Sequence, residues 1–158
     1  MIAQPAVLIR SFALAITVLA IAACGSNPST TTGSTPVSKG EHAATVALEQ
    51  VGAPYRYGGA TPDGFDCSGL VQFSYSRIGV VVPRTTSQLW KASRTVDASE
   101  RRAGDILFFN IEGKMSHVGM YLGKNRFVHA PQSGRTVSVA TLDAPFYKAA
   151  LIRVGRPY

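Results

Sequence analysis

The sequence has few cysteines, few acidic residues and no apolar run long enough to cross a membrane. Its 158 residues contain two cysteines, and nine Asp and Glu against sixteen Lys and Arg, so the formal net charge is +7. The basic residues are scattered, whereas nucleic-acid-binding proteins usually gather them in a stripe with interleaved aromatics. We therefore expect no nucleic acid partner, although attraction to an anionic polymer is compatible with the charge.

The longest apolar run lies at the N-terminus. Residues 11–23 are all apolar or small, and they follow Arg10, the only charge in this part of the chain. A bilayer core needs roughly 20 helical residues, so a shorter run behind a basic residue is typical of a secretory signal. Residues 21–25 read IAACG, which is similar to a bacterial lipobox. We expect residues 1–23 to be a lipoprotein signal peptide and Cys24 to carry lipid; the alternative is an ordinary signal peptide with an accidental cysteine.

A segment dominated by Ser, Thr, Gly and Pro follows the cysteine. Residues 24–40 are predicted to be the lipidated Cys24 and a flexible tether of about 22 Å, because such a composition cannot bury enough surface to fold. Residues 41–158 are predicted to form one domain. By similarity to Gram-negative lipoproteins, Gly25 after the lipidated cysteine favours the outer membrane, facing the periplasm. Lipid on Cys24 would also leave Cys67 as a single free thiol.

The predicted domain has helices first and strands afterwards. Helical spacing of apolar residues indicates helices at 41–52, 67–79 and, for a turn or two, 86–91. Alternating patterns after Gly104 indicate strands at 105–110, 117–122, 126–130, 136–140 and 151–154. This order predicts an α+β layout with an antiparallel sheet.

Cys67 stands at the start of a predicted helix, where Asp66 is placed to cap the first turn. The reactive form of a thiol is the thiolate, and its ordinary pKa of about 8.5 falls at a helix N-terminus or near an imidazolium. Backbone N–H groups there also point at an oxyanion formed during attack. The sequence therefore marks Cys67 as a candidate nucleophile; alternatively, it is a small buried apolar residue.

Two histidines are predicted to lie near each other on neighbouring strands. With a three-residue turn at 123–125, Leu122 pairs with Arg126, and this register places His117 and His129 on one face. Diagonal neighbours on such a face lie about 7–8 Å apart. A change of one residue in the register would send the two side chains to opposite faces.

The two histidines and the cysteine could form a peptidase site. His117 would take the thiol proton, and His129 would hold the ring of His117 in the correct tautomer. Two alternatives remain at this point. The histidines could be structural, or Cys67, His117 and His129 could bind zinc, although the close-spaced ligand pairs of structural zinc sites are missing.

Six short motifs resemble the NlpC family of bacterial cell-wall cysteine peptidases, and they occur in the family's order. They are YRYGG at 55–59, FDCSGLV at 65–71, PRTT at 83–86, GDILFF at 104–109, SHVGMYLG at 116–123 and FVHA at 127–130. The similarity extends over essentially all of residues 41–158. It is strongest to the lipoprotein branch of the family, which includes murein endopeptidases.

This resemblance implies a compact papain-like α+β fold, with N-terminal helices packed on a five- to six-stranded antiparallel sheet. It implies Cys67 as nucleophile, His117 as general base and acid, and His129 as the orienting third member. It also places Tyr55 near the oxyanion, and makes Asp66 and Ser68 part of the substrate site. No metal or cofactor is implied.

The resemblance further implies an enzyme that acts on peptidoglycan stem peptides in the cell envelope, and we expect it to be a monomer. The lipoprotein branch opens the crosslink between D-alanine and meso-diaminopimelate, and we expect the same bond here. The alternatives are the bond between D-glutamate and diaminopimelate, an amide in another substrate, or a wall-binding lipoprotein without activity.

Other conspicuous residues have simpler interpretations. Gly58 is expected to serve a turn, and Trp90, Phe108 and Phe109 are expected in the core. Arg84 could meet a carboxylate of the stem peptide or form a structural salt bridge.

Overall fold

The helices precede the main sheet along the chain, as the sequence predicts. The computed structural model describes residues 37–158, so the predicted signal peptide, Cys24 and most of the predicted tether lie outside the described residues. The elements before the main sheet are α1 (Lys39–Leu48), β1 (Ala60–Thr61), β2 (Gly64–Phe65), α2 (Cys67–Ser76) and α3 (Thr86–Ala92). Within the described residues, no helix is long and apolar enough to span a membrane.

Six strands form one antiparallel sheet in the order β3-β8-β4-β5-β6-β7. Their bounds are β3 (Arg94–Thr95), β4 (Ile106–Ile111), β5 (Lys114–Gly123), β6 (Arg126–His129), β7 (Ser138–Thr141) and β8 (Leu151–Arg156). A 3₁₀ turn (Ala98–Glu100) follows β3, and α4 (Pro145–Ala150) leads into β8. The predicted α+β fold with an antiparallel sheet is confirmed.

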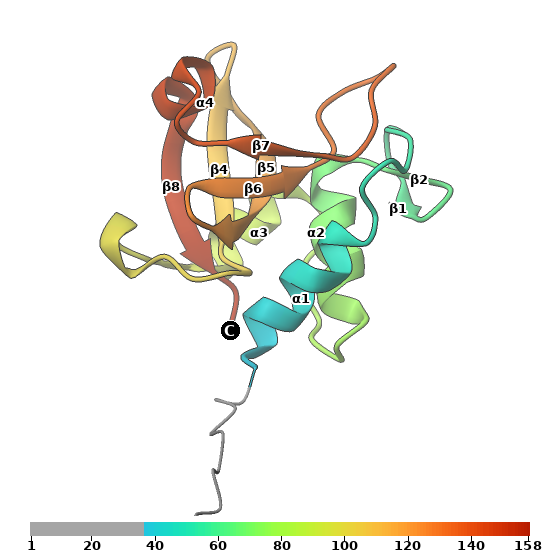
Figure 1. Ribbon diagram of the computed structural model, residues 1–158, viewed down its shortest axis with the longest axis horizontal. Coiled ribbons are helices and arrows are strands. Elements are labelled where there is room, and N and C mark those ends of the chain that lie inside the picture. The colour runs from blue at the N-terminus through green and yellow to red at the C-terminus, as the bar shows by residue number, and fades with distance from the viewer. Residues whose placement is uncertain (1–36) are drawn as a thin grey trace, which may run out of the picture. The chain divides into compact units, whose positions relative to one another are not determined.

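Each face of the sheet has its own hydrophobic core, because alternate residues of a strand point to opposite faces. Phe108 and its same-face neighbours pack against the side that carries α1, α2 and α3, where Tyr75 is fully buried. Phe109 points the other way and packs with Ala150 of α4. Figure 1 shows α1 and α2 on one side of the sheet and α4 beyond its other side. The prediction that Phe108 and Phe109 are core residues is confirmed, and Trp90 packs edge-on against Phe108 with ring centroids 5.2 Å apart.

The first helix begins earlier than predicted. Ser38 accepts a hydrogen bond from Glu41 N at 3.2 Å and donates its own N–H to the Glu41 carboxylate at 2.7 Å. This reciprocal capping box starts α1 at Lys39. The last residues of the predicted tether therefore belong to the folded domain.

The hairpin between β5 and β6 has the predicted register but a different turn. Met120 pairs with Val128 and Tyr121 with Phe127, as the three-residue turn implied. The turn itself has two residues, however, because Gly123 and not Leu122 pairs with Arg126. An irregularity between Tyr121 and Gly123 absorbs the difference, as a β-bulge does.

Candidate active site

The start of α2 is fixed by the Asp66 side chain, and this fixes the position of Cys67. Oδ1 of Asp66 accepts a hydrogen bond from Gly69 N at 2.7 Å, which makes Asp66 the N-cap predicted from the sequence. Gly69 packs so closely on the Gly59 carbonyl that a Cβ at this position would collide with it. Leu70 is buried on the inner side of the helix, so Cys67 is held half-buried at the first helical position.

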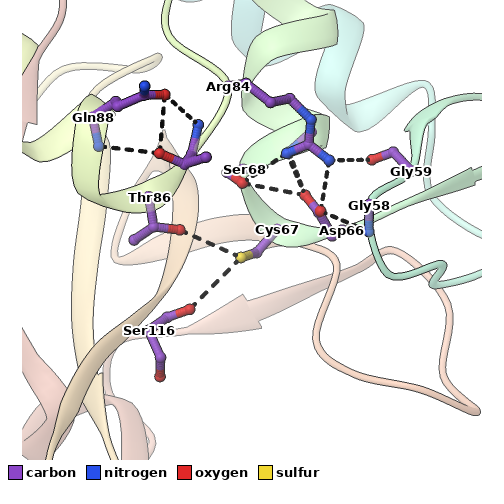
Figure 2. Close-up of polar contacts among 11 residues, drawn as sticks. Gly58, Gly59, Asp66, Cys67, Ser68, Arg84, Thr86, Gln88 and Ser116 are labelled. Carbon is purple, nitrogen blue, oxygen red and sulfur yellow. Dashed lines mark hydrogen bonds and ion pairs between the residues drawn. The ribbon is translucent and has the colours of Figure 1, made fainter.

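Asp66 is also the centre of a polar network (Figure 2). Arg84 donates two hydrogen bonds to its carboxylate, at 2.9 and 2.6 Å, and a third to Ser68 Oγ at 2.9 Å. Gly58 N donates to Oδ2 at 3.0 Å, and Ser68 Oγ donates to Oδ1 at 3.2 Å. Of the two interpretations of Arg84, the structure supports the ion pair. Gly58 adopts a positive φ of 74°, in agreement with its predicted role in a turn.

The network keeps Asp66 ionised. Burial alone would raise the pKa of this carboxyl group, but the hydrogen bonds from Arg84 and Gly69, with the charge of Arg84, lower the pKa below its ordinary value. The carboxylate therefore carries its charge at any pH near neutrality, and it accepts hydrogen bonds on both oxygens.

A cleft of about 580 Å³ opens beside Cys67. Its lining includes Tyr55, Asp66 and Ser68, the three residues predicted to shape an oxyanion or substrate site. Among the described residues, the Tyr55 hydroxyl has no hydrogen-bond partner, and burial raises its pKa, with smaller contributions from the neighbouring Cys67 and Asp66. Tyr55 is therefore a protonated phenol, free to donate a hydrogen bond into the cleft. A hollow of similar volume, about 560 Å³, lies beside α1 and α2, but no nucleophile lines it.

His117 on β5 and His129 on β6 face each other. His117 Nε2 lies 2.8 Å from His129 Nδ1, and the ring centroids are 5.1 Å apart at an angle of 75°. The prediction that the two histidines share a face is confirmed. Because these two nitrogens are joined by one proton, they cannot both bind the same zinc ion, and the zinc alternative is not supported.

The thiol lies next to the segment that carries His117. Cys67 Sγ is 3.9 Å from the carbonyl oxygen of Ser116 and 3.9 Å from Thr86 Oγ1. Among the described residues, no hydrogen bond joins the thiol to an imidazole nitrogen. Since Nε2 of His117 is engaged by His129, Nδ1 is the nitrogen left to accept the thiol proton. Catalytic hydrogen bonds are often long in the absence of substrate and tighten when it binds.

Burial keeps all three groups uncharged at rest. It lowers the pKa of His117 to about 4 and that of His129 to about 3, the latter also because of the neighbouring His117. It raises the pKa of the Cys67 thiol, although the Val118 backbone N–H and the Thr86 hydroxyl oppose this. The Ser68 N–H in the first turn of α2 lowers the thiol pKa, as expected at a helix N-terminus, but burial outweighs it and the net shift is upward. Neutral His117 can act as a base, so proton transfer must accompany attack by sulfur.

Two residues at the site had no role assigned from the sequence. Thr86 belongs to the PRTT motif, and its hydroxyl lies beside the sulfur. Tyr147 lies on α4, a helix that the sequence analysis missed, and its hydroxyl is 3.5 Å from His129 Nε2. No motif surrounds Tyr147, so only the three-dimensional structure connects it with the histidine pair.

The NlpC/P60 family profile matches residues 52–156, a range that contains Cys67, His117 and His129. The chain belongs to the NlpC/P60 family. The resemblance of the six motifs to this family is confirmed.

Relatives of this NlpC/P60 domain are named as enzymes of the cell wall. The chain is 39% identical over 114 residues to the bifunctional muramidase/DL-endopeptidase CwlT of Bacillus subtilis (strain 168), covering 70% of this chain and 34% of that protein. It is 32% identical over 115 residues to murein DD-endopeptidase MepH of Escherichia coli (strain K12), covering 69% of this chain and 42% of that protein.

A solved structure matches over nearly its whole length. The crystal structure of the NlpC/p60 domain of the peptidoglycan hydrolase SagA has 31% sequence identity and a TM-score of 0.65, and the match covers 74% of this chain and 97% of that chain. In contrast, the chain spans less than half the length of CwlT and MepH.

The buried histidines predict a loss of stability in acid. The unfolded chain binds protons on both imidazoles below pH 6.5, whereas the folded domain excludes them until about pH 4 and about pH 3. The free energy of unfolding should therefore fall as the pH drops below 6.5, by up to about 1.4 kcal/mol per pH unit for each histidine. Urea unfolding between about pH 7.5 and pH 5 measures this slope, above the range in which carboxylates titrate.

The matched control is the variant His117→Gln/His129→Gln, whose side chains stay neutral at every pH. It should show a much flatter dependence of unfolding free energy on pH. The same slope in the variant and in the native chain would contradict the assignment of neutral, buried imidazoles.

Proposed function

We propose that this NlpC/P60 domain hydrolyses amide bonds in the stem peptides of peptidoglycan, with Cys67 as the nucleophile. One observation carries the proposal: the thiol at the start of α2 and the hydrogen-bonded pair His117–His129 meet beside an open cleft. The names of the relatives support peptidoglycan as the substrate. A wall-binding lipoprotein without activity would have no need of this arrangement.

The reaction proceeds through a thioester. His117 Nδ1 takes the proton of Cys67 as Sγ attacks the carbonyl carbon of the scissile amide. The C–N bond then breaks, and the leaving amine receives that proton from His117. A water molecule, deprotonated by His117, attacks the thioester carbonyl, and the proton returns to the departing sulfur. Throughout, His117 Nε2–H donates to His129 Nδ1, so the ring stays aligned with the thiol.

The negative charge that develops on the carbonyl oxygen needs hydrogen-bond donors. The Tyr55 hydroxyl lines the cleft beside Cys67 and has no other partner among the described residues. Backbone N–H groups in the first turn of α2 supply further donors, because they have no acceptor within the helix. We assign both to the oxyanion, where such donors commonly contribute most to the rate.

For the bond, we propose the crosslink between D-alanine and meso-diaminopimelate. Among the described residues that line the cleft, Asp66 is the only acidic one, and Arg84, Ser68, Gly58 and Gly69 already engage its carboxylate. A free amino terminus on the substrate would therefore find no open carboxylate. The amino-terminal end of a crosslinked stem carries no free amine, because it remains attached to glycan.

The relatives support either bond, because CwlT is named a DL-endopeptidase and MepH a DD-endopeptidase. The identity to CwlT over 114 residues is 39%, which makes cleavage between D-glutamate and diaminopimelate the second candidate.

We also propose that the domain is anchored in the cell envelope through lipid on Cys24. The IAACG sequence at 21–25 supports lipidation, and Gly25 supports the outer membrane, facing the periplasm. The folded domain starts near Ser38, so residues 25–37 remain as the tether. A monomer is expected.

Replacing either member of the catalytic pair should abolish hydrolysis. We expect Cys67→Ala and His117→Ala each to lower the rate by about three orders of magnitude or more, because nucleophile and base act as a unit. Release of soluble muropeptides from purified peptidoglycan measures the rate, and thermal unfolding verifies that each variant is folded. Cys24→Ala removes the other cysteine and should leave the purified protein fully active. More than trace hydrolysis by pure Cys67→Ala protein would refute the mechanism.

The products distinguish the two bonds. We expect crosslinked muropeptide dimers to become monomers with intact stems, because the proposed bond joins two stems and lies within neither. Mass spectrometry of the digested dimers identifies the products, with Cys67→Ala protein as the control. Stems shortened to end at D-glutamate would assign the other bond, while leaving the role of Cys67 unchanged.

The membrane anchor can be tested by fractionation. We expect the native protein to carry lipid on Cys24 after cleavage behind Ala23, and to partition with membranes. The Cys24→Ser variant should lose the lipid and appear in the soluble fraction when its signal peptide is cleaved. Lipid detected by mass spectrometry on the mature N-terminal peptide checks the modification. Intact association of a cleaved Cys24→Ser protein with membranes would count against the anchor.

A further inference from the structure

The second ring nitrogen of His129 faces a residue outside the family motifs. Tyr147, on α4, places its Oη 3.5 Å from His129 Nε2. Among the described residues, it is the only hydrogen-bond partner of this nitrogen. A line of polar atoms therefore runs from His117 through both nitrogens of His129 to the Tyr147 hydroxyl.

The ring of Tyr147 is held by aromatic packing. It meets His129 edge-on, with centroids 5.4 Å apart at 87°, and Phe127 edge-on, at 4.9 Å and 82°. Phe109 also packs against it, with ring centroids 5.6 Å apart. These contacts limit the positions that the hydroxyl can reach, because interlocked rings leave few rotamers open. Tyr147 is half-buried, so its own O–H proton can point to solvent while an Oη lone pair faces His129.

The direction of the hydrogen bonds decides whether His117 can act as a base. To accept the thiol proton, His117 Nδ1 must be bare, so its proton lies on Nε2 and is donated to His129 Nδ1. His129 must then carry its own proton on Nε2, where it needs an acceptor. In the opposite tautomer, His129 would donate from Nδ1, the proton of His117 would lie on Nδ1, and the thiol would face no base.

We propose that Tyr147 is a positioning residue that selects the productive tautomer of His129, because its Oη accepts a hydrogen bond from Nε2–H. The site is then a chain of four residues, Cys67, His117, His129 and Tyr147, in which Tyr147 acts only through the histidines. This inference rests on the proposed function, because a catalytic effect requires that Cys67 attacks an amide. The tautomer itself is a property of the protein without substrate.

The variant Tyr147→Phe removes Oη and keeps the ring packing. We expect kcat to fall about threefold to tenfold, the usual effect of losing one hydrogen bond between uncharged groups. KM should stay unchanged, because Tyr147 does not line the cleft. The control is Tyr121→Phe, which should retain native kcat. The Tyr121 hydroxyl lies in the same core and accepts a hydrogen bond from Asn125 N at 3.3 Å, so this variant loses a comparable hydroxyl away from the histidines.

Two measurements separate this role from a structural one. Imidazole ¹⁵N shifts should report a proton on His129 Nε2 in the native protein, and a smaller population of that tautomer in Tyr147→Phe. In a double-mutant cycle, Tyr147→Phe should have no further effect on kcat in a His129→Gln background. Glutamine has no imidazole, so there is no tautomer for Tyr147 to select.

The possible outcomes are distinct. A bare His129 Nε2 in the native protein, or an equal loss of kcat in both backgrounds, would overturn the role of Tyr147 while leaving the proposed function intact. If the native protein hydrolyses no peptidoglycan, the proposed function fails, and the ¹⁵N shifts still decide whether Tyr147 selects the tautomer.

Discussion

The ionised carboxylate of Asp66 is the constraint on which the site depends. It caps α2, so it fixes where Cys67 begins the helix, and it binds Gly58 N, so it also fixes one wall of the cleft. Asp66 also forms an ion pair with Arg84. Arg84 directly precedes Thr85, the N-cap of α3, so this ion pair fixes the start of α3 as well. Three segments separated in sequence thus meet on one charged group. A carboxylate in this setting tolerates burial because each of its oxygens accepts hydrogen bonds from donors that the fold supplies.

Unlike Asp66, the groups proposed to carry out the reaction are uncharged at rest. His129 lies among the rings of Phe127, Tyr147 and His117, with centroids at 4.9, 5.4 and 5.1 Å, and this cage excludes the water that would stabilise an imidazolium. The same burial keeps the Cys67 thiol protonated. Oxidation of cysteine follows thiolate character, so a thiol that stays protonated at rest resists oxidation between reactions. In the proposed mechanism, charge is therefore created only during the reaction, where the first turn of α2 and the Tyr55 hydroxyl can stabilise it.

The parts of the site that depend on local pattern could be predicted from the sequence. The position of Asp66 before Cys67 predicted the cap, and the spacing of His117 and His129 about a short turn predicted their common face. The predicted length of the turn was nevertheless wrong by one residue. The predicted register is still correct, because the irregularity near Leu122 compensates for the shorter turn. Sequence patterns do not reveal such bulges, since they depend on the twist and packing of the finished sheet.

Features that depend on distant partners could not be predicted. The contact of Arg84 with Asp66 joins residues 18 positions apart, and the sequence left a substrate contact equally open. The raised pKa of Cys67 depends on burial by segments that pack only in the folded domain. Helix α4 has six residues and begins at Pro145, too short for a periodic pattern, so the neighbour of His129 on this helix stayed hidden.

The groups proposed to carry out the reaction do not by themselves determine which bond is cleaved. The proposed catalytic groups lie on α2, β5 and β6, whose positions follow from two hydrophobic cores. Relatives with different named specificities share this domain with the chain. Specificity must therefore reside in the cleft surface around these groups. Tyr57, 90% exposed at the cleft, is free to contact substrate, whereas Asp66 is already saturated by internal donors. Because Asp66, the one acidic residue among the described residues of the cleft, is occupied, shape and hydrogen bonds remain for recognition, and this supports the proposal of a substrate strand without a free amine.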